Sequence, residues 1–398
     1  MTKNPMIINS ELDILNVNGH VHSPYSFCSF DSIEQMFKMA REEDVHVLGI
    51  NDFFTMDGYP EFSRLSKQYK VYPQFNVEFI GLLSDLQAKG IRINDPNNPG
   101  RIYFSGKGLS YPLVINDENK AFIDGLISES QRQIKEMTQK ASALVDAIDP
   151  ELEFTYESVK AAYAEELVRE RHIAKAIRIA VFEKYVEEAD RNAFFEKLYD
   201  GKAVKANLND IASVENELRG NLLKSGGKAF VEEDPAAFPP LKRIIQFIIN
   251  AGGIPCYPVL LDDKKGNILT EFESHWEAMD TILQELNVHA VELIPSRNSV
   301  EKLREFVAYF RAKGYAVFLG SEHNTPGVFP VEVKIEGTLE LPDDLKHVSY
   351  EGACLIAAHQ HLHANDQAGY VDEEGNADKQ NMESYIKMGD EVIKSFIK

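Results

Sequence analysis

The sequence has few cysteines and lacks both a long apolar run and a recognisable leader. Its three cysteines, Cys28, Cys256 and Cys354, are far apart and odd in number, so they do not predict a disulfide framework and favour a reducing cytoplasm. No apolar run reaches the roughly 18 residues that a membrane span needs. Residues 1–13 lack the basic and apolar regions of a signal peptide, which again favours a cytoplasmic location.

Positive charge is also scarce. The 398 residues include 42 Lys and Arg against 63 Asp and Glu, which gives a formal net charge of -21. A surface this acidic repels a phosphate backbone and argues against nucleic-acid binding. A small anionic or sugar-like substrate remains compatible with it. The length allows one barrel-sized domain with an insertion, or two domains, and does not determine the oligomeric state.

The sequence does contain acidic and imidazole side chains at the ends of short apolar stretches. The first pair is His20 and His22. Side chains at i and i+2 of a strand point to the same face, so both imidazoles can reach one metal ion. A lone pair of this kind often only hydrogen-bonds to itself, but the pattern recurs and favours a metal site. The later groups are Asn51-Asp52, Asn76-Val77-Glu78, Val291-Glu292 and Ser321-Glu322-His323.

Strands and helices are expected to alternate in two parts of the chain. Strands are predicted at 12–22, 45–50, 71–79, 254–261, 289–294 and 315–319. Helices are predicted from a cap at Asp31-Ser32 to about Glu42, and at 241–250, 276–286 and 300–313. This alternation indicates a parallel sheet. The polar groups then fall at the carboxyl ends of the strands, where (β/α) barrels build their active sites.

A long helical region interrupts this alternation. Apolar residues recur at intervals of three and four from about residue 119, Asp149-Pro150 breaks the pattern, and further helices are predicted at 156–180 and 183–198. We expect residues 85–235 to form a loop and helical insertion domain. The barrel would then comprise residues 1–84 and 236–345, and residues 346–398 would form a C-terminal helical extension.

Taken in order, these motifs resemble the PHP (polymerase and histidinol phosphatase) superfamily of metal-dependent phosphoesterases. The matching segments are His20-Val21-His22, residues 50–58, Asn76-Val77-Glu78, residues 251–258 and Gly320-Ser321-Glu322-His323. The insertion, with Arg171-His172 and residues 195–201, is similar to that of the subgroup that hydrolyses nucleotides and short RNA phosphates. The resemblance covers roughly residues 12–325. It implies an α/β fold, a distorted (β/α)7 TIM-like barrel with a large helical insertion.

The sequence departs from the family pattern at several ligand positions. The family usually has Asp-His where this chain has Asp52-Phe53, and Ala-His-Pro where it has Cys256-Tyr257-Pro258. An Asp-x-His usually closes the site, and here Ser321-Glu322-His323 stands in its place. The early Asp is replaced by Phe27 or Ser29, with Asp31 close by. A family site with three metal ions therefore loses ligands, and fewer than three divalent ions are expected.

The resemblance implies a role for each remaining polar residue. The expected metal ligands are His20, His22, Glu78, Glu322 and His323, a nitrogen and oxygen set that suits Zn, Mn or Fe. The expected catalytic residues are Asp52 and Glu292, and the expected substrate-binding residues are Arg171, His172, Tyr257 and Arg297.

Structural alternatives remain open for several of these residues. Asp52 could ligate a metal, orient a ligand histidine or cap a loop. Glu292 could ligate, act as a base or form an ion pair. Arg171 could hold a phosphate or lie on a solvated helix face. Among His359, His361 and His363, the pair His359 and His363 at i, i+4 could bind a metal, or the segment could be a packed or solvent-facing helix.

Three functions follow. The first is a hydrolase, a phosphoesterase acting on a small phosphorylated metabolite through a metal-activated water. The second is a PHP-fold protein whose reduced metal site acts on or binds a sugar-like ligand. The third is a non-catalytic binding protein. The four ligands His20, His22, Glu78 and His323 favour the first, whereas Phe53 and Tyr257 favour the other two.

Overall fold

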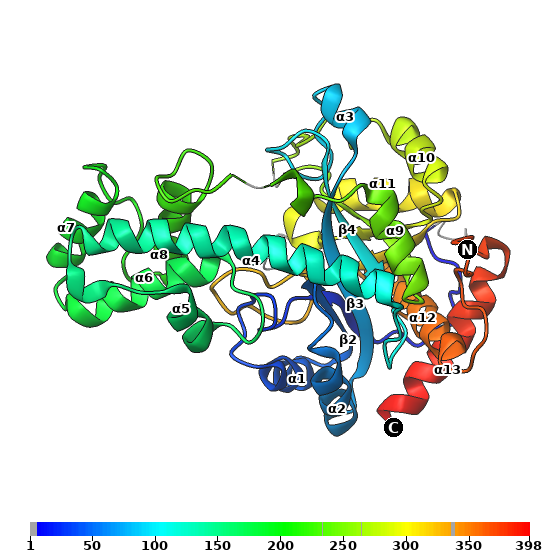
Figure 1. Cartoon of the computed structure of the whole chain (residues 1–398). Coiled ribbons are helices and arrows are strands. Elements are labelled where there is room, and N and C mark those ends of the chain that lie inside the picture. The colour runs from blue at the N-terminus through cyan, green and yellow to red at the C-terminus, as the bar shows by residue number, and fades with distance from the viewer. Residues whose placement is uncertain (1–5, 233, 264, 336–338) are drawn as a thin grey trace.

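A seven-stranded sheet forms the centre of the molecule (Figure 1). The computed structural model describes residues 6–232, 234–263, 265–335 and 339–398. The sheet strands, in spatial and chain order, are β1 Asn16–Val21, β2 Val45–Phe53, β3 Tyr72–Leu82, β4 Arg101–Lys107, β5 Ile254–Val259, β6 Ala290–Leu293 and β7 Ala316–Leu319. Two short strands, β8 Lys334–Ile335 and β9 Leu339–Glu340, pair separately.

The sheet curves until its two edges meet. Pairs β1–β2, β2–β3, β5–β6 and β6–β7 are parallel, whereas β4 is antiparallel to both neighbours. The amide of His22 donates to the Glu322 carbonyl at 2.8 Å, and the Glu322 amide donates to the His20 carbonyl at 2.8 Å. Gly320 permits this approach, because a Cβ there would lie 2.3 Å from the His20 Cβ. The expected distorted TIM-like barrel is confirmed.

Helices cover the outside of the barrel. They are α1 Ile33–Glu42, α2 Tyr59–Tyr69, α3 Ser84–Ala88, α9 Leu241–Asn250, α10 Trp276–Glu285 and α11 Val300–Ala312. The prediction for α1 is confirmed: the Ser32 hydroxyl accepts from the Gln35 amide at 3.1 Å, and the helix buries Met36 and Phe37 against the core. Helix α9 ends as predicted, before Gly252 at φ +67°.

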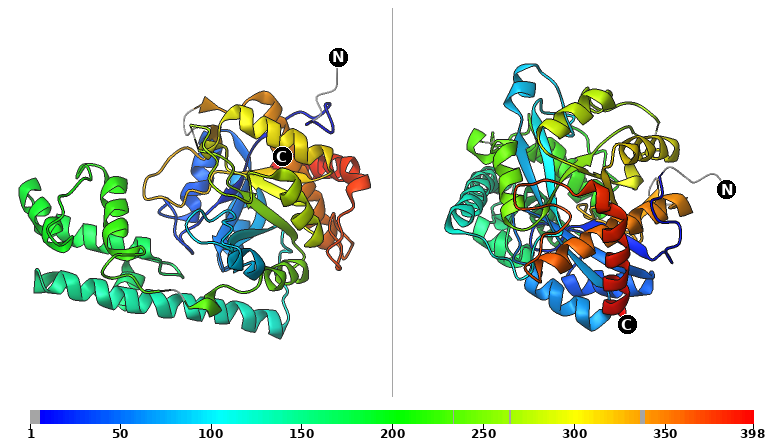
Figure 2. Two further views of the ribbon diagram at one scale, coloured as in Figure 1. Left: turned by 90° about the horizontal axis from the view of Figure 1, so that it is seen from above. Right: turned by 90° about the vertical axis from the view of Figure 1, so that its right-hand side faces the viewer.

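Two C-terminal helices close one end of the barrel. Helix α12, Asp343–His363, packs against β7 and β1, and α13, Met382–Ile397, packs on α12 (Figure 2, right). The Gln74 amide near the start of β3 donates to the Ala353 carbonyl of α12 at 3.2 Å. The amino ends of the strands are therefore covered, and the polar groups at their carboxyl ends face away from α12. No described helix is long and apolar enough to cross a membrane.

The insertion has an apolar core of its own, formed by residues between Ile134 and Val231. Its helices are α4 Asp117–Asp146, α5 Tyr156–Tyr163, α6 Glu170–Lys184, α7 Glu188–Leu198 and α8 Ile211–Leu218. They project to one side of the barrel in two perpendicular views (Figures 1 and 2). The single helix predicted over 156–180 is interrupted, because the Leu167 amide leaves the helical pattern and donates to the Tyr25 carbonyl at 3.1 Å.

The predicted boundary at residue 85 is wrong for one element. Strand β4 lies within 85–235 and yet pairs with β3 and β5 in the barrel sheet. Its glycine-flanked sequence and short length conceal a strand, and its antiparallel direction breaks the expected β/α alternation. The helical part of the insertion therefore begins after β4, with α4 at Asp117.

Candidate metal centre

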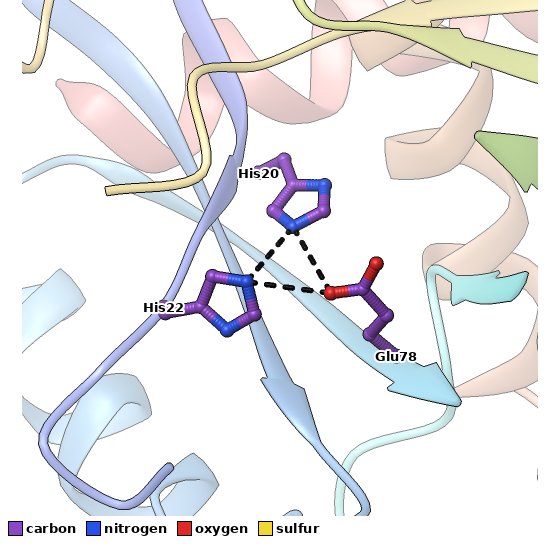
Figure 3. A group of neighbouring side chains, drawn as sticks. All are labelled: His20, His22 and Glu78. Carbon is purple, nitrogen blue, oxygen red and sulfur yellow. Dashed lines mark hydrogen bonds and ion pairs between the residues drawn. The ribbon is translucent and has the colours of Figure 1, made fainter. Parts of the chain in front are cut away.

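Three side chains from two strands meet inside the carboxyl end of the barrel. His20 lies on β1, His22 follows it directly, and Glu78 lies on β3 (Figure 3). Both histidines are fully buried, and Glu78 is 4% exposed. One ligand atom from each lies within 4.8 Å of the other two. The structure thus brings together three of the five predicted metal ligands.

The spacing of these atoms fits a small divalent cation. The two Nε2 atoms are 3.4 Å apart, and Glu78 Oε2 lies 3.3 Å from His22 Nε2 and 3.7 Å from His20 Nε2. Atoms about 2.1 Å from a tetrahedral ion lie about 3.4 Å from one another. The triangle therefore matches one face of a tetrahedral nitrogen and oxygen site.

The outer nitrogen of each imidazole has a partner that sets its tautomer. His20 Nδ1 lies 2.9 Å from Glu292 Oε2, and His22 Nδ1 lies 3.4 Å from Ser26 Oγ. A carboxylate can only accept, so His20 donates from Nδ1 and keeps a lone pair on Nε2. The Asn51 amide nitrogen is 3.2 and 2.9 Å from the two ring nitrogens of His20, so it lies beside the ring rather than along either lone pair. Glu292, predicted as catalytic, orients a candidate ligand here.

Asp52, near the end of β2, lies behind Ser26, which belongs to the turn that follows β1. Its carboxylate accepts from the Ser23 amide at 2.7 Å and from the hydroxyls of Ser23 and Ser26 at 2.5 Å. Burial raises the pKa of Asp52, although His22 and the two serines oppose the shift. The structure therefore places Asp52 as a cap of the turn that carries His22, one of the alternatives left open above.

Burial and neighbouring charges shift the pKa values of the two glutamates of the site in opposite directions. Burial raises the pKa of Glu78 to about 8 against the opposing effect of His20. Burial would also raise the pKa of Glu292, but Lys107 and His20 outweigh it and lower that pKa to about 2. Burial lowers the pKa of His22, which favours the neutral imidazole that a metal needs.

Lys107, at the end of β4, is the charged residue that sequence reasoning missed. Its side chain is fully buried, and its ammonium lies 2.5 Å from Glu292 Oε1. A short stretch that contains the apolar residues Ile102 and Phe104 ends in the charged residue Lys107. This is the same strand-end signal as in the other groups, but in a region expected to be loops.

Glu322 and His323 lie at the barrel seam with their side chains engaged elsewhere. The Arg297 guanidinium pairs with Glu322, which also accepts from the Asn324 amide at 2.8 Å. His323 Nε2 donates to the Phe329 carbonyl at 3.1 Å, and Nδ1 lies 2.6 Å from Ser321 Oγ. The structure does not bring these two predicted ligands into the triad.

The backbone at this seam is unusual. Glu322 and His323 have φ values of +70° and +60°, two consecutive non-glycine residues in the left-handed region. Such a conformation is strained and persists only where the surrounding structure enforces it. Here the hydrogen bonds that close the barrel between β1 and β7 enforce it.

The four predicted substrate residues lie in different surroundings. Tyr257 is fully buried and donates to Glu273 at 2.8 Å, and Arg297 is held by Glu322. His172 is buried at the start of α6, where its Nδ1 accepts from the Arg169 amide at 2.9 Å. Arg171 lies over the Phe27 ring at 5.5 Å, and burial lowers its pKa to about 10.

Phe53, which stands where the family usually has histidine, covers the triad. Its ring stacks on His22 with centroids 4.9 Å apart, and the Arg169 guanidinium lies 4.8 Å from the centroid of the same Phe53 ring. Arg169 comes from the insertion, so this stack joins the insertion to the metal centre. The proximity of Arg169 could not be inferred from sequence spacing, because it depends on how the insertion folds back.

The other histidines singled out from the sequence lie in the helix that closes the barrel. His359 is fully buried in α12 and its Nε2 donates to the Gly252 carbonyl at 2.9 Å, while its ring lies 4.5 Å from that of His363. His361 is exposed. The segment is thus a packed helix, as one of the two alternatives held.

The chain is similar to known proteins in part of its sequence and in its fold. A PHP domain model matches residues 18–196. The structure is similar to a Bifidobacterium adolescentis protein described provisionally as a metal-dependent phosphoesterase, at 16% identity over 83% of this chain and 94% of that one, with a TM-score of 0.53. It is also similar to a Chromobacterium violaceum amidohydrolase solved with sulfate and no metal, at 14% identity over 83% and 93% of the two chains, with a TM-score of 0.52.

No curated protein matches the chain. At these identities the solved structures establish the shared fold. The barrel fold and the family-model match make residues 18–196 similar to PHP domains.

Proposed function

We propose that this protein is a metal-dependent hydrolase of phosphate esters of a small metabolite, with a divalent ion held by His20, His22 and Glu78. The observation that carries the proposal is the triangle of two Nε2 atoms and one carboxylate oxygen, with edges of 3.3 to 3.7 Å. The PHP domain and its metal-dependent phosphoesterase neighbour support the same class of hydrolase. Zn, Mn and Fe suit this donor set.

A bound ion would supply Lewis acidity, polarising a phosphoryl oxygen and lowering the pKa of a water. The chain's own residues prepare the site for it. Glu292 holds the proton of His20 at Nδ1, and Ser26 accepts the Nδ1 proton of His22, so both Nε2 lone pairs stay directed inward. The Phe53 ring limits the access of water to His22.

Arg169 is the cation best placed to attract the phosphate. Its guanidinium lies 4.8 Å from the centroid of the Phe53 ring that stacks on His22, and it forms no salt bridge within the described part of the chain. Arg171 is directed to Phe27 and Asn216, and Arg297 is held by Glu322. An unpaired guanidinium beside a metal centre offers a fork to phosphate oxygens.

Metal content measured with turnover tests the proposal. Protein purified without chelator is analysed by ICP mass spectrometry beside His20→Ala/His22→Ala, with His361→Ala as the matched control for loss of an exposed histidine. We expect metal in the wild type and the control and its loss in the double variant, with phosphoester turnover following the metal. A silent phosphoester panel, together with metal content that the double variant retains, would refute the proposal.

A second candidate is a protein that binds a sugar-like ligand without hydrolysing it. The observation that favours it is Phe53, which replaces a family ligand and covers His22. This candidate predicts thermal stabilisation by a sugar or sugar acid, and no phosphate release from any ester in the panel. Turnover abolished by the His20→Ala/His22→Ala variant would exclude it.

A further inference from the structure

The ammonium of Lys107 has the surroundings of a bound cation. It is fully buried inside the barrel, and three oxygen atoms face it: Glu292 Oε1 at 2.5 Å, Asn51 Oδ1 at 3.3 Å and the Gly19 carbonyl at 3.5 Å. Carboxylate and amide carbonyl oxygens are also the ligands that hard divalent cations take. A buried ammonium is costly unless paired in this way.

This cation position adjoins the triad through one carboxylate. Glu292 contacts Lys107 with Oε1, and with Oε2 it contacts His20 Nδ1 at 2.9 Å. Lys107 is therefore linked to the triad through Glu292 and the ring of His20, whose Nε2 faces His22 and Glu78.

The local charges favour one ion beside the lysine rather than two ions. Glu322 is paired with Arg297, and the Asp52 oxygens accept three hydrogen bonds in the turn after β1. Glu78 and Glu292 remain as the carboxylates that face the interior of the site. A divalent ion and one ammonium already exceed their negative charge, which leaves the centre attractive to a phosphate.

We propose that Lys107 occupies the position of a second metal ion and thereby restricts this centre to a single ion at His20, His22 and Glu78. The inference rests on the proposed metal site and goes beyond it, because it concerns how many ions the barrel interior accepts. Lys107 acts through Glu292 and is a positioning residue. Removing its ammonium leaves a vacant set of oxygen ligands beside the first ion.

The test is the gain of an ion in Lys107→Ala, measured on the full chain loaded with Mn²⁺. ICP mass spectrometry gives the number of bound ions per chain. We expect one ion in the wild type and two ions in Lys107→Ala. Equal numbers of ions in the two proteins would overturn the inference, and so would two ions in the wild type.

Two control variants separate this effect from general loss of a buried charge. Arg311→Ala removes another buried cation, whose guanidinium lies 3.3 Å from Glu351 below the barrel, and should gain no ion. Lys107→Ala/Glu292→Gln removes the carboxylate as well and should also gain none. A second ion in either control would overturn the inference.

Lys107→Gln serves if Lys107→Ala does not fold, because it keeps a neutral donor for Glu292. It is scored in the same way, by the gain or absence of a second ion. A wild type that binds no ion contradicts both the proposed function and this inference. One ion in both the wild type and Lys107→Ala overturns the inference alone and leaves the proposed function standing.

Discussion

Breaking the Lys107–Glu292 pair should destabilise the barrel, and the two substitutions should not be additive. Both side chains are fully buried, so removing one partner leaves a charge without its main counter-charge. Loss of one member of a buried ion pair typically lowers the free energy of unfolding by about 3–5 kcal/mol. The contacts that remain in each single variant indicate whether its loss of unfolding free energy lies at the lower or the upper end of this range.

Lys107→Met leaves Glu292 with a second partner, His20 Nδ1 at 2.9 Å, so we expect a loss near the lower end, about 3 kcal/mol. Glu292→Gln leaves the Lys107 ammonium with only the longer contacts to Asn51 and Gly19, 3.3 and 3.5 Å, so we expect a loss near the upper end, about 5 kcal/mol. The double variant removes both charges. Its loss should fall short of the sum by at least about 2 kcal/mol.

Tryptophan fluorescence during urea unfolding in the presence of a chelator measures these changes without a contribution from metal. The only tryptophan, Trp276, lies on barrel helix α10 and packs against Phe306 with ring centroids 5.4 Å apart. The signal therefore reports the barrel and not the insertion, which has a separate core. Additive losses, or single variants within about 1 kcal/mol of the wild type, would refute the account of a buried and mutually dependent pair.

Three further predictions follow from the site and its surroundings. Ser26→Ala removes the acceptor of the His22 Nδ1 proton and should weaken metal affinity about 10–100-fold in a chelator competition titration, and unchanged affinity would contradict the role given to Ser26. Arg169→Ala should raise KM for a phosphate ester about tenfold and leave metal content unchanged, because the guanidinium is expected to bind the substrate phosphate and not the metal ion. A change confined to kcat would contradict this. Burial lowers the pKa of His359 to about 3, below its unfolded value of 6.5, so its contribution to stability is present above pH 6.5 and is lost as the pH falls towards 3. Between pH 7 and pH 5 this loss is about 2 kcal/mol, and it should be absent from His359→Gln in urea unfolding at the two pH values.

The parts of the fold that could be predicted are those where local signals agree. Helix α1 has a serine cap and an apolar face in register, and helix α9 ends before a glycine with positive φ. Strand β4 could not be found in the same way. Its seven residues include a glycine and end in a buried lysine, and only the two neighbouring strands make them a strand.

The same distinction holds within the site. The His20 and His22 side chains share a face because of strand periodicity, so their convergence follows from sequence alone. The roles of Ser26 and Lys107 depend on how three separate strands approach one another. Arg169 reaches Phe53 only because the chain leaves its helix near Leu167 to bond with Tyr25, a tertiary contact that propensity does not encode.

The order of the strands along the chain has a consequence for the newly synthesised protein. All three candidate ligands lie within the first 78 residues, whereas Glu292, which holds the tautomer of His20, follows the whole insertion. Chains emerge from the ribosome amino end first, so the ligands become available to cellular metals long before their orienting carboxylate exists. With the proposed metal site, tight binding would therefore wait until β6 and β7 complete the barrel. A ribosome stalled before residue 292 would present a nascent chain that has the candidate ligands but lacks the carboxylate that orients His20.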